Sequence, residues 1–207
     1  MFNIISYSKS TDDNAYYIVL DNDGKRVIVK TRSYKVKPMH KKNYIKRDIN
    51  IEGDCDIQEL FNYLVNEYPL FIYYVPEEYL SDNMIDNAIL KEGGVLSIID
   101  KSRRNVDRCS KALSENGLVY RSVPKECRSF NLAYCAVRSN GLALKHIEEE
   151  YKCYELCLRA VFSDLRAFKW VPDIYHERLL IDLCTLGIID GKYLKDNNVE
   201  NMIKNLI

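Results

Sequence analysis

The chain has 207 residues, of which 47% are hydrophobic and 29% charged, and its 30 basic and 30 acidic side chains give a formal net charge of zero. This composition fits one globular domain, or one domain with a small appendage, and argues against a disordered chain. No apolar stretch approaches the roughly 18 residues that a membrane-spanning helix needs, and the first residues lack the basic and apolar regions of a signal peptide. We therefore expect a cytoplasmic protein that does not enter a membrane.

Residues 1–55 predict a small β-rich N-terminal domain with an antiparallel sheet. Runs of β-branched, aromatic or alternating apolar residues predict strands at 2–8, 15–20, 25–30 and 44–51. Between the second and third strands, Asp21-Asn22-Asp23-Gly24 is typical of a hairpin turn.

Residues 56–207 predict a second domain, made of short helices that repeat every 24 residues. The first helix is expected at 57–67, because Asp56 and Glu59 have the spacing of a capping box and Pro69 closes the segment. Each repeat carries four side chains, mostly apolar, at positions i, i+1, i+4 and i+5, which lie on one stripe of a helix. The six sets are Leu60/Phe61/Leu64/Val65, Met84/Ile85/Ala88/Ile89, Arg108/Cys109/Ala112/Leu113, Leu132/Ala133/Ala136/Val137, Leu156/Cys157/Ala160/Val161 and Leu180/Ile181/Cys184/Thr185.

Further positions recur with the same period. A second apolar residue occurs at Val75, Ile99, Val123, Ile147 and Val171, and each is followed by proline or an acid, which predicts a new helical turn. Three glycines, Gly93, Gly117 and Gly141, follow predicted helices, and we expect them to end these helices as residues with positive φ.

One such segment cannot bury its own apolar face, so neighbouring segments must stack. The predicted fold class is therefore α+β, a small N-terminal antiparallel sheet followed by an α-helical, solenoid-like repeat domain. Val199, Met202, Ile203 and Leu206 predict a C-terminal capping helix.

The repeats resemble a known family. The pattern AxxxNGLALxxI from Ala136 to Ile147, followed by ELCLRAV from Glu155 to Val161, is similar to the short helical repeats of the domain of unknown function 4116. The resemblance covers about residues 56–187, but the first repeat lacks the glycine and Asp164-Leu165 replaces Asn-Gly in the fifth. It implies a viral or pathogen accessory or effector protein, and it carries no catalytic residues.

Candidate catalytic and metal-binding groups are sparse. The seven cysteines are an odd number without a CxxC pair, which indicates reduced thiols, and we expect Cys109, Cys157 and Cys184 on the buried stripe. A Cys127 or Cys135 nucleophile paired with His146 stays open as an alternative, because a sequence cannot show proximity. We predict no enzyme, no cofactor and no metal site.

Residues 25–47 contain ten bases and no acid. With Tyr34 and Tyr44 among them, these bases could contact phosphates and stack on nucleobases. A solvated hairpin, or one that packs against acids such as Glu148–Glu150, is the alternative. The predicted basic patch consists of Lys30, Arg32, Lys35, Lys37, Lys41, Lys42, Lys46 and Arg47.

The leading functional hypothesis is a non-enzymatic protein-interaction module that binds a host or partner protein, in the host-cell cytoplasm if the protein is viral. Tyr79, Tyr151 and Tyr175 occupy one repeat position and form the predicted ridge that contacts the partner; the alternative is that they fill gaps between repeats. The second hypothesis is a nucleic-acid-binding protein that uses residues 25–47. Either is compatible with an oligomer, because an open end of a helical stack exposes apolar surface.

Overall fold

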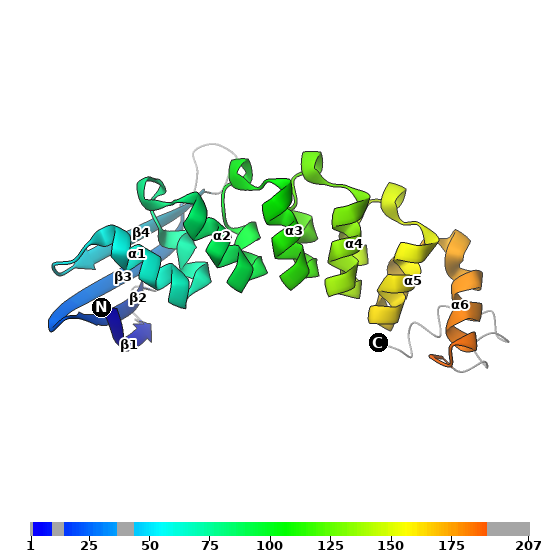
Figure 1. Cartoon of the computed structure of the whole chain (residues 1–207), viewed down its shortest axis with the longest axis horizontal. Coiled ribbons are helices and arrows are strands. Elements are labelled where there is room, and N and C mark those ends of the chain that lie inside the picture. Colours follow the sequence, from blue (N-terminus) through cyan, green and yellow to red (C-terminus); the bar gives the residue numbers. More distant parts are fainter. Residues whose placement is uncertain (1, 10–14, 37–43, 190–207) are drawn as a thin grey trace. The chain divides into compact units, whose positions relative to one another are not determined.

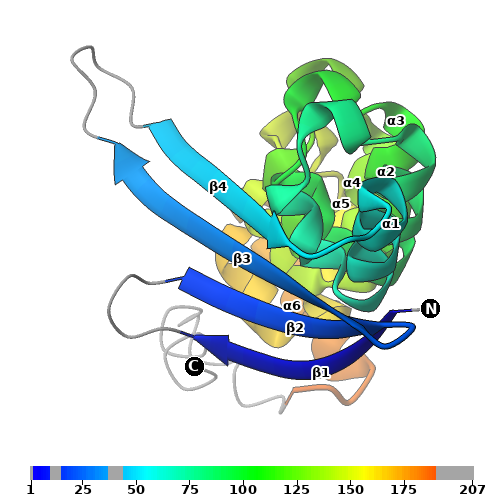
Figure 2. The ribbon, with the colours of Figure 1, turned by 90° about the vertical axis from the view of Figure 1, so that its left-hand side faces the viewer.

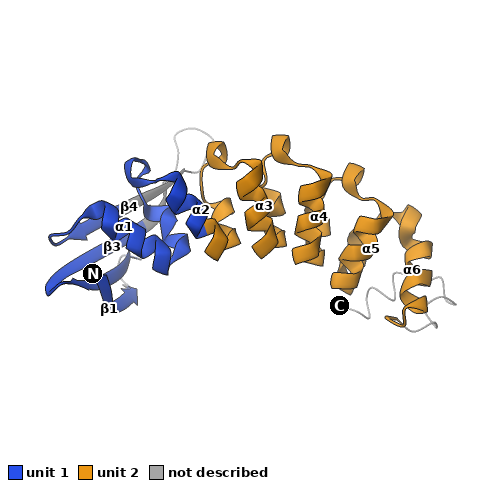
Figure 3. Ribbon diagram, viewed as in Figure 1, with its two compact units in different colours: residues 1–88 blue, residues 89–207 orange. Residues whose placement is uncertain are grey.

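The computed structural model describes residues 2–9, 15–36 and 44–189, with residues 33–36 and 44–48 described by their backbone alone. Four strands precede the helices, so the α+β class is confirmed (Figure 1). The chain forms two compact units, residues 1–88 and residues 89–207 (Figure 3). The predicted boundary at residues 55 and 56 marks the change from strands to helices and stays a prediction as a domain boundary.

The first unit contains a four-stranded antiparallel sheet in the order β1-β2-β3-β4 (Figure 2). All four predicted strands are confirmed, and the third extends six residues beyond its predicted end. The predicted hairpin turn is also confirmed, because Asp23 and Gly24 both have positive φ between the paired residues Asn22 and Lys25. The strands are β1 (Phe2–Lys9), β2 (Ala15–Asn22), β3 (Lys25–Val36) and β4 (Tyr44–Glu52).

One face of this sheet is buried. Ile18, Leu20, Val27 and Val29 alternate along β2 and β3 and are almost fully shielded from solvent. The ring of Phe2 on β1 lies 5.6 Å from the ring of Tyr63 on α1, so this helix packs against the sheet. The sheet is followed in this unit by α1 (Ile57–Glu67), the 3₁₀ helix η1 (Pro69–Tyr74), the 3₁₀ helix η2 (Glu77–Tyr79) and most of α2 (Asp82–Lys91).

The remaining described helices follow the predicted 24-residue spacing up to α5. Helices α2 to α5 begin at Asp82, Val106, Phe130 and Tyr154. Each is followed by a longer and a shorter 3₁₀ helix, and the shorter ones begin directly after the predicted proline or acid. The elements are α2 (Asp82–Lys91), η3 (Gly93–Ser97), η4 (Lys101–Arg103), α3 (Val106–Glu115), η5 (Gly117–Ser122), η6 (Lys125–Cys127), α4 (Phe130–Ser139), η7 (Gly141–His146), η8 (Glu149–Tyr151), α5 (Tyr154–Ser163), η9 (Leu165–Trp170), η10 (Asp173–Tyr175) and α6 (His176–Thr185).

The side chains of the first five predicted sets are all buried, as are the five second apolar residues from Val75 to Val171. Cys109 and Cys157 are buried as predicted, whereas Cys184 is only half-buried. The predicted capping helix around Val199 lies outside the described residues. In the described part of the chain, no helix combines the length and apolar character of a membrane span.

The sixth predicted set is wrong. Helix α6 buries Leu179, Leu180 and Leu183, while Ile181 is 48% exposed. Helices α3 to α5 each follow an extended residue, but η10 runs into α6 through Tyr175, which has helical dihedral angles. Helix α6 therefore begins earlier than the 24-residue period requires. As a result, the residues that it buries are shifted toward the N-terminus, to Leu179, Leu180 and Leu183.

The prediction that Gly93, Gly117 and Gly141 end helices through positive φ is also wrong. Among the described residues, glycines with positive φ occur only at 24, 53 and 187. The three glycines instead begin 3₁₀ helices and lie against the next α-helix. A Cβ atom added to Gly93 would lie 2.5 Å from the carbonyl oxygen of Ala112, and at the other two positions the overlap would be greater. Their missing side chain therefore permits close packing.

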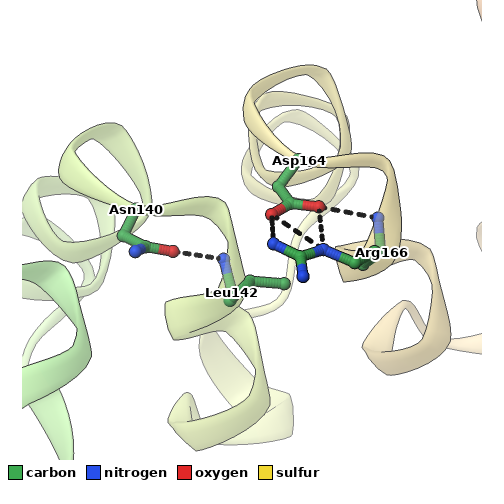
Figure 4. Close-up of polar contacts among 4 residues, drawn as sticks. All are labelled: Asn140, Leu142, Asp164 and Arg166. Atoms are coloured by element: carbon green, nitrogen blue, oxygen red, sulfur yellow. Dashed lines mark hydrogen bonds and ion pairs between the residues drawn. The ribbon is translucent and has the colours of Figure 1, made fainter. Parts of the chain in front are cut away.

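The residue before each of the 3₁₀ helices η3, η5, η7 and η9 caps that helix with its side chain. The amide group of Leu142 donates to Oδ1 of Asn140 over 3.0 Å, and the amide group of Arg166 donates to Oδ1 of Asp164 over 2.9 Å (Figure 4). Asp164 also forms an ion pair with the guanidinium group of Arg166, at 2.7 Å. Glu92 and Asn116 make the same cap for η3 and η5. This position therefore satisfies an amide group that the start of a helix leaves without a partner.

A second recurring polar contact involves a base five residues after three of these buried apolar residues, Ile99, Val123 and Val171. The guanidinium group of Arg104 donates to the carbonyl oxygens of Ile99 and Ser122, at 2.7 and 2.8 Å. Nε of Arg128 donates to Val123 over 3.0 Å, and Nε2 of His176 lies 2.9 Å from the carbonyl oxygen of Val171. These bases pair with carbonyl groups that the preceding 3₁₀ helix leaves open.

We predict that Gly93→Ala destabilises the second unit by about 1–3 kcal/mol, because its methyl group would push against the backbone of α3. Gly94→Ala is the matched control, since its Cβ atom would meet only the flexible carboxylate of Glu92. It should change stability by less than about 0.5 kcal/mol. Urea denaturation followed by circular dichroism measures both. Equal midpoints for the two variants would contradict the close-packing role.

We predict a pH-dependent contribution from Asp164. Hydrogen bonding to Arg166 lowers the pKa of this carboxyl group, so its stabilisation is fully present above the unfolded-state pKa of about 4 and is lost as pH falls from there through the lowered folded-state pKa. Asp164→Asn keeps the cap but removes the ion pair. It should cost about 0.2–1 kcal/mol at pH 7, and the cost should shrink steadily as pH falls below about 4, as measured by urea unfolding. Asn140→Asp, with no arginine two residues later, is the control that should gain no such pair.

Candidate functional site

A tyrosine-lined pocket of about 580 Å³ lies within the first compact unit, between the sheet and η1. This volume falls in the range of pockets that hold small ligands or short peptide segments, roughly 300–1,000 Å³. We call it the tyrosine pocket; its lining residues are Tyr7, Tyr16, Ile18, Thr31, Tyr68, Leu70, Phe71 and Tyr74.

The register of the sheet brings one wall of the pocket together. Tyr7 is opposite Ile18 on β2, and Tyr16 is opposite Thr31 on β3. Residues opposite each other in an antiparallel pair share a face, so all four lie on the buried face of the sheet. The pocket lies on the same face as the buried residues Leu20, Val27 and Val29, at the part of the sheet that carries Tyr7 and Tyr16.

An irregularity in β1 decides that Tyr7 belongs to this wall. The register shifts between Ile4 and Ser6, so one residue of β1 is passed over in the pairing. Strict alternation from Phe2 would place Ser6 on the inner face, and the shift places Tyr7 there instead.

The second wall comes from the segment after α1. Pro69 stops that helix and begins η1, which is typical of proline at the first helical position. The rings of Phe71 and Tyr74 lie 5.7 Å apart in a tilted arrangement, and Leu70 is 53% exposed. The wall is thus aromatic and apolar, and part of it faces solvent.

The tyrosine hydroxyl groups add a neutral polar lining. Burial raises the pKa of Tyr7, and the nearby phenol groups of Tyr16, Tyr74 and Tyr68 raise it further. Tyr7 therefore stays protonated at neutral pH and can donate a hydrogen bond. Nζ of Lys9 lies 5.5 Å from the ring centroid of Tyr16 and brings a positive charge to this cluster.

The predicted basic patch does not form part of this pocket as far as its side chains are described. Lys30 is opposite Asn50 and Arg32 is opposite Ala15, so both lie on the sheet face away from Tyr16. Nζ of Lys30 lies 5.1 Å from the ring centroid of Tyr17 on that outer face. Lys35, Lys46 and Arg47 lie on the paired strands β3 and β4, and Lys37, Lys41 and Lys42 lie outside the described residues.

The three predicted ridge tyrosines are half-buried at the ends of short 3₁₀ helices. The ring of Tyr79 lies 5.3 Å from that of Phe61, and the ring of Tyr175 lies 5.8 Å from that of Tyr154. The hydroxyl group of Tyr151 donates to the carbonyl oxygen of Arg128 over 3.3 Å. These contacts favour the gap-filling alternative, and a partner-binding role for the three stays a prediction.

The structure does not pair the candidate nucleophiles with a base. Sγ of Cys127 lies 3.6 Å from the carbonyl oxygen of Arg104, and neither Cys127 nor Cys135 hydrogen-bonds to His146 in the described part of the chain. Burial raises the pKa of Cys109 to about 11, away from the thiolate form. Among the described residues, no three or more histidine, cysteine, aspartate or glutamate side chains form a group that could hold a metal ion.

Sequence reasoning missed the tyrosine pocket. One signal was present, because the segment from Tyr68 to Tyr74 reads YPLFIYY and concentrates four aromatic rings after a helix. Comparison with known proteins adds no relative: no family model matches the chain, and neither a curated protein nor a solved structure matches it. The resemblance to the domain of unknown function 4116 therefore stays a prediction.

Proposed function

We propose that the chain is a non-enzymatic protein-interaction module whose tyrosine pocket holds an extended, proline-containing segment of a partner protein. The observation that carries this proposal is the pocket itself, an open cavity with aromatic rings on both walls and the protonated hydroxyl group of Tyr7 among them. Aromatic rings offer large contact areas with little loss of side-chain freedom, and tyrosine adds a hydrogen-bonding group at the edge of an apolar surface.

A polyproline segment suits this lining for two reasons. Its backbone makes no internal hydrogen bonds, so its carbonyl groups are free to accept from tyrosine hydroxyl groups, and proline itself brings no amide donor. Its conformation is also largely formed before binding, so ordering it costs less free energy. The cation of Lys9 beside Tyr16 favours an acidic residue in the same segment.

The helices form the second part of the proposal. The 24-residue spacing of α2 to α5, and of the 3₁₀ helices that follow them, supports a solenoid-like repeat that presents a rigid surface. The resemblance to the domain of unknown function 4116 supports an accessory or effector protein of a virus or pathogen, acting on a partner protein in the cytoplasm.

A nucleic-acid-binding function is the second candidate. It is favoured by the pairing of β3 with β4, which brings the basic residues of both strands into one hairpin, and by the contact of Lys30 with Tyr17 on the outer sheet face. Lys30 and Tyr17 lie on the sheet face opposite the tyrosine pocket, and the two candidates can be tested with separate variants.

We predict that selection from a displayed library of random peptides against the full chain enriches sequences with several prolines and an acidic residue. Tyr7→Ser should weaken binding of an enriched peptide at least about tenfold, or 1.4 kcal/mol, because it removes a ring from the pocket wall. Leu70→Ser should act in the same direction. Both residues are more than half exposed, so the fold should tolerate the changes.

Tyr17→Ser, on the outer face of the sheet, is the matched control and should bind the enriched peptide as the unchanged chain does. Fluorescence anisotropy measures the affinities, and circular dichroism checks folding. Enriched sequences without proline, or binding that survives Tyr7→Ser and Leu70→Ser, would overturn the peptide proposal.

For the second candidate, we predict affinity for mixed-sequence RNA or DNA oligomers that falls steeply with salt. Changing Lys41, Lys42, Lys46 and Arg47 to glutamate should abolish it, since phosphate contacts release counterions in proportion to their number. A salt titration of binding measures this effect. The absence of binding by the unchanged chain at low salt would remove the nucleic-acid function.

A further inference from the structure

A second cavity, of about 340 Å³, lies within the second compact unit among the 3₁₀ helices η3, η5 and η7. Three consecutive repeats contribute to it, and no residue is shared with the tyrosine pocket. We call it the His146 pocket; its lining residues are Gly94, Ser97, Asn116, Leu118, Val119, Arg121, Ser122 and His146.

Several polar groups in this lining can donate hydrogen bonds to a ligand, whereas the hydroxyl group of Ser97 already donates to the carbonyl oxygen of Gly94 over 2.7 Å. Asn116 uses its Oδ1 atom to cap Leu118, at 3.1 Å, which leaves the amide Nδ2 group as a donor. The carbonyl oxygen of Ser122 accepts a hydrogen bond from Arg104, and the hydroxyl group of Ser122 remains as a donor toward the cavity. Arg121 is exposed and makes no ion pair with the residues that the structure describes.

The charge around the pocket is positive. No carboxylate lines it, and the adjacent Glu92 uses an oxygen to cap the amide group of Gly94, at 3.2 Å. Burial lowers the pKa of His146, and the positive charges of Lys145, Arg121 and Arg128 lower it further. Arg128 is itself paired with Glu148. The imidazole of His146 is thus close to several cations. A bound anion would offset their positive charge and raise the pKa of the imidazole again.

We propose that the His146 pocket binds a tetrahedral oxyanion of the phosphate type, either free or as a phosphate monoester. Arg121 supplies a charged fork of donors, which suits phosphate oxygens, and His146, Ser122 and Asn116 supply the remaining donors. Bases at the ends of η5, η7 and η9 also compensate helix dipoles, but that effect does not require a cavity lined by donors.

The site makes a distinctive prediction for His146. A bound dianion stabilises the imidazolium form, so it raises the pKa of His146, and by linkage the affinity increases as pH falls through that pKa. Sulfate is the suitable first probe because it keeps two negative charges between pH 5 and 8. Sodium chloride at matched ionic strength shows the effect of screening alone.

The experiment is an NMR titration of the His146 ring in the full chain with sodium sulfate and with inorganic phosphate. We expect saturable shifts, a raised pKa of His146, and a loss of affinity of at least tenfold in Arg121→Gln. Arg121→Lys should retain part of the affinity. Lys169→Gln changes the same repeat position outside the cavity and should bind as the unchanged chain does.

Phosphoserine and serine distinguish the two sources of the oxyanion. Tighter binding of phosphoserine than of phosphate assigns the site to a phosphorylated partner, and the reverse assigns it to the free anion. Shifts that match those in sodium chloride, or equal affinity of Arg121→Gln and the unchanged chain, would overturn the proposal. Neither result bears on peptide binding, because the tyrosine pocket lies in the other compact unit.

Discussion

The close approach of a glycine Cα atom to the carbonyl oxygen of an alanine in the next helix is the constraint on which the packing of the second unit depends. Gly93, Gly117 and Gly141 lie against Ala112, Ala136 and Ala160, and a Cβ atom at any of the three would overlap the facing carbonyl oxygen. This contact sets how closely each 3₁₀ helix and the following α-helix pack. Leu165 replaces glycine in the fifth repeat, and the regular register ends at the helix that follows.

The buried stripes of the first five repeats could be predicted because they depend on local spacing alone. The role of the glycines could not, since a glycine after a helix suits both a positive φ and a close approach, and only the neighbouring helix decides between them. The register of α6 was equally hidden. Its sequence offers Leu179 and Leu183 as well as Leu180 and Cys184. The early start of the helix buries Leu179 and Leu183 together with Leu180 and leaves Cys184 half-buried.

The tyrosine pocket was beyond sequence reasoning for a different reason. Its walls combine residues from three strands with residues that follow α1, so it depends on how these elements pack. The register shift after Ile4 also reverses the alternation that predicts which side chains face inward. Without it, Ser6 would take the place of Tyr7 on the inner face, and the pocket would lose the ring that stacks on Tyr16.

Recurrence itself separates structural from functional polar groups in the second unit. The capping position and the basic position that begins with Arg104 are filled by similar side chains in successive repeats. Internal backbone groups use the caps and the bases Arg104, Arg128 and His176, whereas Lys152 pairs with Glu149. His146 differs, because its equivalents Tyr74, Ile98, Ser122 and Trp170 are side chains of different chemistry. A half-buried histidine at a position without a common side chain, beside a cavity with positive charge around it, is therefore the feature on which the proposed oxyanion site depends.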